Sequence, residues 1–267
     1  MGVLAVRGEG PGAASPPAGP VPSALVQGVR FHALSVGETA DRVLAWAHAG
    51  ESRAVLFSNA HGVVETHDDP AFEDTLNAAD LNLPDGAPVV WSLRHLGLGA
   101  ERVYGPDVTA EVLRRAAAEN VPVAFYGSSP ETLGALAERL PALAPGLRVA
   151  TMISPPFRPL TEEEDAEHVR QLEASGARVV FVGLGCPRQE RWAVAHRGRV
   201  PAVMLAVGAA FDFHAGRVRQ APAVLQRAGL EWAFRLAVEP RRLWRRYARV
   251  VPRFLWGMAG QALWRRA

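Results

Sequence analysis

The stretch VPVAFYGSSPETLGALAERL, residues 121–140, decides the fold class, because a strand, a glycine-containing turn and a helix follow one another in it. Its first six residues carry no charge and are nearly all apolar, which is typical of a strand buried on both faces of a parallel sheet. Ser129 and Pro130 then stand at the N-cap and first position of a helix, where a hydroxyl group and a fixed φ are favoured. The stretch therefore predicts one unit of an α/β fold.

The same rhythm continues on both sides of this unit. Thr161 and Glu164 form the capping-box pattern that opens a second predicted helix, TEEEDAEHVRQLEAS. Four further apolar runs are predicted strands: AVLFSNA (54–60), LRVATMI (147–153), ARVVFVGLG (177–185) and AVMLAVGAA (202–210). The alternation predicts an α/β fold with a mostly parallel, Rossmann-like sheet and helices on both of its faces, followed by a C-terminal helical appendage.

Composition divides the chain into three segments. Residues 1–25 are rich in Gly, Ala and Pro, lack the apolar run of about 7–15 residues that a secretory signal needs, and are expected to be a disordered leader. Residues 26–220 carry the strand and helix pattern of the α/β domain. Residues 221–267 have no strand pattern, and Pro240 and Pro252 are expected to divide them into helical pieces.

Composition also limits the cellular compartment and the kinds of site that the chain can contain. Cys186 is the single cysteine among 267 residues, so no intramolecular disulfide can form and a cytoplasmic location is the default. No run approaches the roughly 18 uninterrupted apolar residues of a spanning helix, so any membrane contact is expected to be peripheral. The chain contains no Lys, which excludes a P-loop.

The appendage is strongly basic: six arginines and no acid lie between Arg241 and Arg253, interleaved with Leu, Trp, Tyr and Val. Cations and apolar residues at this spacing are typical of an interfacial helix on anionic lipid. A helix packed on the core explains the aliphatic residues equally well, but not so many arginines beside tryptophans. Nucleic-acid binding is a third interpretation, and the rest of the chain gives it no support. An exposed apolar tail also makes a homo-oligomer possible.

Three loops that follow predicted strands indicate nucleotide binding: YGSSPE (126–131), VGLGCPRQE (182–190) and VGAAFDFHAGRV (207–218). Each places glycine where a backbone can approach a ligand closely, and the first leads into a helix N-terminus that favours phosphate. A single such loop would be an ordinary turn, whereas three in consecutive units favour a nucleotide. A dinucleotide-binding oxidoreductase is disfavoured, because GSSPET is not G-x-G-x-x-G and no acid follows the next strand.

Asp85 is the candidate general base. It lies in a Pro-Asp-Gly turn, where it either bonds to its own backbone or accepts a proton from a substrate hydroxyl. Asn59, just past a strand, is placed to orient a sugar or that carboxylate. The eight histidines show no metal-ligand spacing, so neither a metal nor a cofactor is expected, and arginine would neutralise a leaving diphosphate.

Several of these blocks occur together in one known family. They are FSNAHGVV (57–64), ADLNLPDGAPVVW (79–91), FVGLGCPRQERW (181–192), VGAAFDFHAG (207–216) and APAVLQRAGLEWAFRLAVEPRRLWRRY (221–247). In this order they resemble the WecG/TagA/CpsF family of bacterial glycosyltransferases. Phe57 departs from the family pattern, which usually has Thr at that position.

The resemblance implies an inverting, metal-independent transfer of a hexose or N-acetylhexosamine, ManNAc-like or glucosyl, from a UDP-sugar. The implied acceptor is a polyprenyl-diphosphate-linked sugar, in cell-surface polysaccharide or teichoic-acid-type synthesis. The enzyme would then work at the inner face of the cell membrane, held there by residues 221–267. An NAD(P)-dependent oxidoreductase and a non-catalytic peripheral membrane protein are the alternatives.

The resemblance also assigns site residues. Asp85 is expected to be the base, with Asn59 and Gln189 as further catalytic residues. The resemblance places Arg235, Arg242 and Arg245 on the diphosphates. The further residues expected to bind the substrates come from the three loops after predicted strands and are Gly127, Ser128, Gly183, Gly185 and Asp212.

Overall fold

The centre of the molecule is a six-stranded parallel sheet with strand order β4-β3-β8-β7-β5-β6. The computed structural model describes residues 19–222, 224–225, 229 and 231–264, except the side chains of 242 and 262–264. The strands are β3 (Arg53–Ser58), β4 (Leu81–Pro84), β5 (Val123–Gly127), β6 (Val149–Ile153), β7 (Val179–Gly183) and β8 (Val203–Ala206). The predicted parallel sheet is therefore confirmed.

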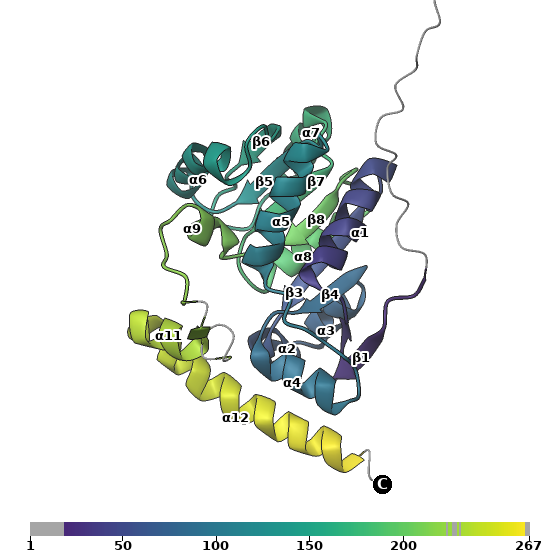
Figure 1. The fold of residues 1–267 in the computed structure, drawn as a ribbon, viewed down its shortest axis with the longest axis vertical. Helices are drawn as coiled ribbons and strands as arrows, with labels where there is room; N and C mark the ends of the chain where they lie inside the picture. The colour runs from purple at the N-terminus through teal and green to yellow at the C-terminus, as the bar shows by residue number, and fades with distance from the viewer. Residues whose placement is uncertain (1–18, 223, 226–228, 230, 265–267) are drawn as a thin grey trace, which may run out of the picture.

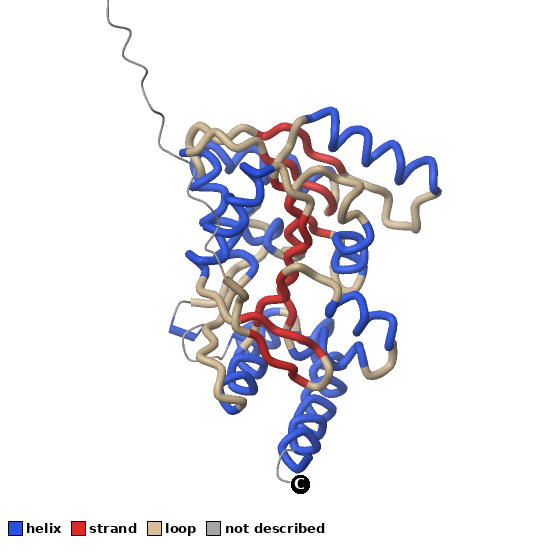
Figure 2. The backbone as a smooth tube through the Cα atoms, turned by 90° about the vertical axis from the view of Figure 1, so that its right-hand side faces the viewer, coloured by secondary structure: helices blue, strands red, loops and turns tan. Residues whose placement is uncertain are grey.

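Helices cover both faces of this sheet, and Figure 2 shows the column of strands with helices on either side. One face packs against α1 (Val36–Ala49), α5 (Gly105–Ala118), α6 (Pro130–Leu143) and α9 (Ala210–His214). The other packs against α2 (Ala60–Thr66), α3 (Pro70–Asn77), α4 (Ala87–His95), α7 (Glu162–Ser175) and α8 (Arg188–Ala195). A hydrophobic core lies on each face of the sheet, and successive residues of a strand point to opposite cores. In β3, Val55 and Phe57 lie in the core beneath α1 and α5, and Ala54 and Leu56 lie in the second core, on the opposite face.

A short antiparallel hairpin, β1 (Ser23–Val26) with β2 (Val29–His32), precedes the sheet. It buries Val26, Val29 and Phe31 against the second core. The strand thus begins inside the segment 1–25 expected to be a leader, of which residues 1–18 lie outside the described residues.

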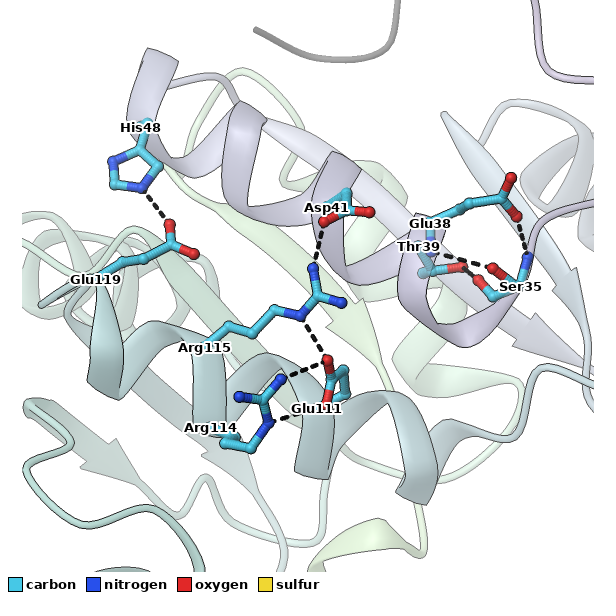
Figure 3. A network of polar contacts seen from close by, with 9 residues as sticks. All are labelled: Ser35, Glu38, Thr39, Asp41, His48, Glu111, Arg114, Arg115 and Glu119. Atoms are coloured by element: carbon cyan, nitrogen blue, oxygen red, sulfur yellow. Dashed lines mark hydrogen bonds and ion pairs between the residues drawn. The ribbon is translucent and has the colours of Figure 1, made fainter. Parts of the chain in front are cut away.

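Polar contacts fasten α1 to α5 on the outer surface (Figure 3). Arg115 on α5 pairs with Asp41 on α1 and, at 2.5 Å, with Glu111. At the other end of the helices, His48 lies 2.7 Å from Glu119. Exposed pairs of this kind contribute only about 0–1 kcal/mol each. These contacts fix the position of α5 relative to α1. The position matters because α5 begins at the carboxyl edge of the sheet, where the candidate site lies.

The appendage consists of α11 (Glu231–Val238) and α12 (Pro240–Trp264), which runs along the lower side of the molecule in Figure 1. Its inner face buries Leu243, Val250 and Phe254. Gln261 accepts a hydrogen bond from the backbone N–H of Gln27 at 3.0 Å and so ties α12 to the hairpin. Among the described helices, none is both long and apolar enough to cross a membrane.

The expected division of the appendage at Pro252 is wrong. Pro240 begins α12 as predicted, but Pro252 lies inside one continuous helix of 25 residues. Proline removes the hydrogen bond to the carbonyl of Ala248. Both residues lie on the exposed face of α12, where water can solvate that carbonyl, while Val250 and Phe254 stay buried on either side of the proline.

Candidate active site

Several of the predicted site residues lie along the carboxyl edge of the sheet. Asn59 follows β3, Asp85 follows β4, Gly127 ends β5 and Gly183 ends β7. Since all six strands are parallel, their carboxyl ends lie along one edge, although these residues are far apart in the sequence. This edge is where ligands bind in open α/β sheets.

The loops after β3 and β4 touch at Asp85. The backbone N–H of Asp85 donates to the carbonyl of Ser58 at 2.9 Å. Gly86 has φ 153°, and a Cβ there would lie 3.3 Å from the Cβ of Asn59. Asn59 Oδ1 caps α2, accepting from the backbone N–H groups of His61 and Gly62 at 3.0 and 3.4 Å. Asn59 therefore lies beside the Asp85 loop, and its catalytic role stays a prediction.

Asp85 is electrostatically suited to be a base. Desolvation is the largest effect and, with the negative charge of Glu231, raises the pKa of Asp85 to about 7. The cations Arg102 and Arg235 and the backbone N–H of Gly105 act in the opposite direction. When the pKa of a carboxyl group lies near the pH of the reaction, a large fraction of it is ionised and it is still basic enough to take a proton.

Three residues of this cluster were not predicted: Arg102, Tyr104 and Glu231. The Tyr104 hydroxyl donates to Glu231 Oε1 at 2.9 Å, and Arg102 pairs with the other carboxylate oxygen. The Arg102 guanidinium lies over the Tyr104 ring, 4.0 Å from its centroid. Arg102 and Tyr104 precede α5 in a loop without any motif, and only tertiary contact with α11 reveals them.

The three predicted arginines of the appendage do not share one environment. The Arg235 guanidinium lies 5.8 Å from the centroid of the Phe213 ring. Its buried Nε has no hydrogen-bond partner among the described residues and so can serve an anionic ligand. Arg245 is exposed on α12, where its guanidinium lies 5.6 Å from the Trp244 ring. The side chain of Arg242 lies outside the described residues.

The glycine-containing loops after β5 and β7 are in direct contact. The backbone N–H of Ser128 donates to the carbonyl of Gly183 at 2.9 Å. Ser128 itself has φ 64°. A Cβ on Gly183 would lie 3.0 Å from the Phe211 ring, whereas Gly185, with φ 78°, has open space on its Cβ side. The backbone at Gly185 is therefore open to close approach, whereas the backbone at Gly183 is covered by Phe211.

Asp212 lies near the helix that follows this loop. Ser129 caps α6 by accepting from the backbone N–H of Thr132 at 3.2 Å, and the Thr132 hydroxyl lies 3.5 Å from an Asp212 carboxylate oxygen. The structure thus brings Gly127, Ser128 and Asp212 to the α6 N-terminus, where helix N–H groups favour phosphate.

Gly127→Ala is expected to destabilise the protein by about 2–4 kcal/mol. Gly127 has φ 119°, and a Cβ there would lie 2.6 Å from the carbonyl carbon of Gly183, on backbone that cannot move freely. Urea unfolding measures the effect. Gly134→Ala is the matched control: a Cβ there meets nothing within 4 Å on α6, and alanine should stabilise that helix by about 0.5–1 kcal/mol. Equal stabilities for the two variants would contradict the expectation.

Gln189 is buried, and its amide is fully engaged by the protein. Its Oε1 accepts from the backbone N–H of Gly185 at 3.0 Å, while its Nε2 donates to Glu190 at 3.0 Å and to the carbonyl of Ala206 at 3.1 Å. Gln189 thus holds the loop after β7 against β8. Its catalytic role stays a prediction, and these contacts indicate that it shapes the loop.

Glu190 is a second carboxyl group with an altered titration. Burial raises the pKa of Glu190 to about 7, and its Oε2 has no hydrogen-bond partner among the described residues. The pKa of the neighbouring Cys186 thiol is also raised, because the protein desolvates the thiol although the residue as a whole is exposed. Neither residue was a predicted site residue, and sequence patterns carry no sign that Glu190 is buried.

Phe57, the departure from the family pattern, points into the core rather than into the site. It is buried, and its ring lies 3.8 Å from the position of a Cβ on Gly105. The aromatic ring therefore supports the start of α5, whose first N–H faces Asp85.

Comparison of the sequence with known proteins identifies the family. The model of the glycosyl transferase WecG/TagA/CpsF family matches residues 24–267, which include both the α/β domain and the appendage. One relative, the N-acetylglucosaminyldiphosphoundecaprenol N-acetyl-beta-D-mannosaminyltransferase of Bacillus spizizenii, is 32% identical over 194 residues, 72% of this chain and 73% of the relative. The carboxylate, the glycine loops and the appendage thus lie in a matched sequence, and the chain belongs to the WecG/TagA/CpsF family of glycosyltransferases.

Proposed function

We propose that this glycosyltransferase moves an N-acetylmannosamine-type sugar from UDP to a polyprenyl-diphosphate-linked N-acetylglucosamine. The observation that carries the proposal is Asp85, a carboxyl group with a pKa near 7 at the carboxyl edge of the sheet, beside Arg102 and Arg235. The name of the Bacillus spizizenii relative supports the choice of sugar and acceptor.

The chemistry follows from a base and nearby cations. Asp85 takes the proton of an acceptor hydroxyl as that oxygen attacks C1 of the donor sugar from the face opposite UDP. The new C1–O bond forms while the bond from C1 to the UDP oxygen breaks, so the anomeric configuration inverts. Negative charge develops on the departing diphosphate, and the cation of Arg235 and the N-terminus of α6 are the groups that stabilise it.

The donor fits the glycine loops. Its diphosphate would approach the backbone at Gly127 and Ser128, and Gly185 leaves space beside them. The Asp212 carboxylate would accept hydrogen bonds from hydroxyl groups of the nucleoside or the sugar. These placements explain why the predicted donor residues come from three different strand ends.

A membrane-facing surface fits the lipid-linked acceptor. The outer face of α12 exposes Trp244 (54%), Val251 (47%), Leu255 (61%) and Trp256 (84%). Arg241 and Arg245 are exposed on the same helix. An apolar stripe with flanking cations binds an anionic lipid surface. We therefore infer that α12 lies on the inner face of the cell membrane and that the protein is cytoplasmic and peripheral.

The proposed function is tested by a screen of UDP-sugars with a polyprenyl-diphosphate-linked N-acetylglucosamine acceptor. We expect a product heavier by one N-acetylhexosamine with UDP-N-acetylmannosamine, detected by mass spectrometry, and a β linkage by NMR. UDP-glucose, UDP-N-acetylglucosamine and NAD are the comparison ligands. Transfer from UDP-glucose alone would change the donor assignment, and binding of NAD without UDP would overturn the proposal.

A further inference from the structure

We propose that Glu231 of the appendage is a positioning residue: it holds Arg102 and Tyr104 beside Asp85 and so prepares the Asp85 carboxylate to accept a proton. The inference rests on the proposed function, because it concerns how Asp85 is prepared for proton transfer.

The contacts of Glu231 are the first reason. Its side chain is only 13% exposed, and both carboxylate oxygens are used, one by the Tyr104 hydroxyl and the other by Arg102. Tyr104 is itself buried, and the Arg102 guanidinium lies over its ring. One carboxylate from the appendage therefore fixes both side chains of the loop before α5.

This loop is attached directly to the Asp85 strand. The backbone N–H of Val103, between Arg102 and Tyr104, donates to the carbonyl of Pro84 at 3.0 Å. Gly105 follows, and its N–H faces the Asp85 carboxylate. The segment that carries Arg102 and Tyr104 therefore contacts both the residue before Asp85 and the Asp85 carboxylate.

Charge is the second reason. The charged groups that act on Asp85 are Arg102 from the loop and Glu231 and Arg235 from α11. Glu231 raises the pKa of Asp85 directly, and it also pairs with Arg102, the cation that lowers this pKa most. Asp107, on α5, lies in the field of the same Arg102 and Glu231. Removing the negative charge of Glu231 therefore lowers the pKa of Asp85.

Glu231→Gln tests the proposal in the full-length enzyme. The amide keeps the size of the side chain and an acceptor for Tyr104, but it cannot pair as an anion with Arg102. We expect kcat/KM to fall about tenfold at pH 8. We also expect the acidic limb of its pH profile to move to lower pH by about half a unit or more.

Glu239→Gln is the matched control, because Glu239 is the other acid of the appendage, at the junction of α11 and α12. It should leave the acidic limb in place. A residue that only anchors the appendage would lower activity without moving that limb. An unshifted limb in Glu231→Gln would therefore overturn the proposal.

Tyr104→Phe is the second variant, in case Glu231→Gln loosens the appendage. It keeps every charge but removes one of the two contacts of Glu231. We expect a loss of kcat of about threefold to tenfold with an unmoved acidic limb, and a combined variant less impaired than the product of the two single losses. Multiplicative losses would count against the inference. If wild type transferred no sugar, the proposed function itself would fail.

Discussion

Asp85→Asn is expected to lower kcat/KM by about 10²–10⁴-fold, the largest effect of any single substitution in this protein. The amide cannot accept the proton of the acceptor hydroxyl, although it keeps the shape of the side chain. In the wild type, kcat/KM should fall about tenfold per pH unit below pH 7, because the pKa of Asp85 is raised to about 7 and the protonated carboxyl group is inactive. Initial rates with UDP-sugar and lipid acceptor measure both effects.

The same substitution should stabilise the fold. Because the pKa of Asp85 is raised in the folded state, that state binds more protons than the unfolded state between about pH 4 and pH 7, so stability falls as pH rises through this interval. The asparagine side chain does not ionise, and Asp85 is partly exposed, so we expect a gain of about 1–3 kcal/mol at pH 8.

Asp74→Asn, on the exposed surface of α3, is the control and should change neither quantity appreciably. Urea unfolding at pH 5 and pH 8 separates the variants, since the gain should shrink to roughly a third at the lower pH. Near-normal transfer by Asp85→Asn would show that another group is the base.

Replacing Trp244, Leu255 and Trp256 together by Ser should weaken binding to anionic vesicles by about 10²-fold. All three side chains are exposed on the outer face of α12, so their removal costs little in the folded protein. Transfer to a water-soluble acceptor should stay near the wild-type rate, while transfer to vesicle-bound acceptor falls. Vesicle co-sedimentation and the two assays measure these outcomes.

Phe157→Ser is the matched control for this variant, because Phe157 is 72% exposed in the segment between β6 and α7. It should bind vesicles like the wild type. Unchanged vesicle binding by the triple variant would contradict the membrane role of α12. A deletion after Glu239 is a poorer test, because it also removes the buried Leu243, Val250 and Phe254 from the core.

Local patterns were sufficient for most of the fold. Apolar runs predicted five of the six strands of the sheet, whereas the four-residue edge strand β4 was too short to be recognised. Ser129 and Thr161 cap α6 and α7 as their positions indicated. Pro252 was misjudged, because its effect depends on which face of the helix meets water. A proline on an exposed helix face is tolerated when the buried face continues on both sides.

The candidate site was only partly predictable. Asp85 was found through its Pro-Asp-Gly turn, and Gly127 and Gly185 through the loops after their strands. Gln189 was named from the family pattern, yet its amide is engaged within the loop. Glu231 went unnoticed, because its neighbours Arg102 and Tyr104 are more than 100 residues away and no local pattern records such a contact.

The sequence by itself determined the α/β class, the parallel sheet and the family, because these depend on short-range periodicity, capping and motif order. Only the tertiary structure decided that α11 brings Glu231 and Arg235 to Asp85, and that α12 turns Trp244 and Trp256 outward. The physical reason is that burial and charge pairing are properties of the folded surface. The pKa of Asp85 is set by burial and by neighbours from two other segments, the loop before α5 and the helix α11, which only packing brings together.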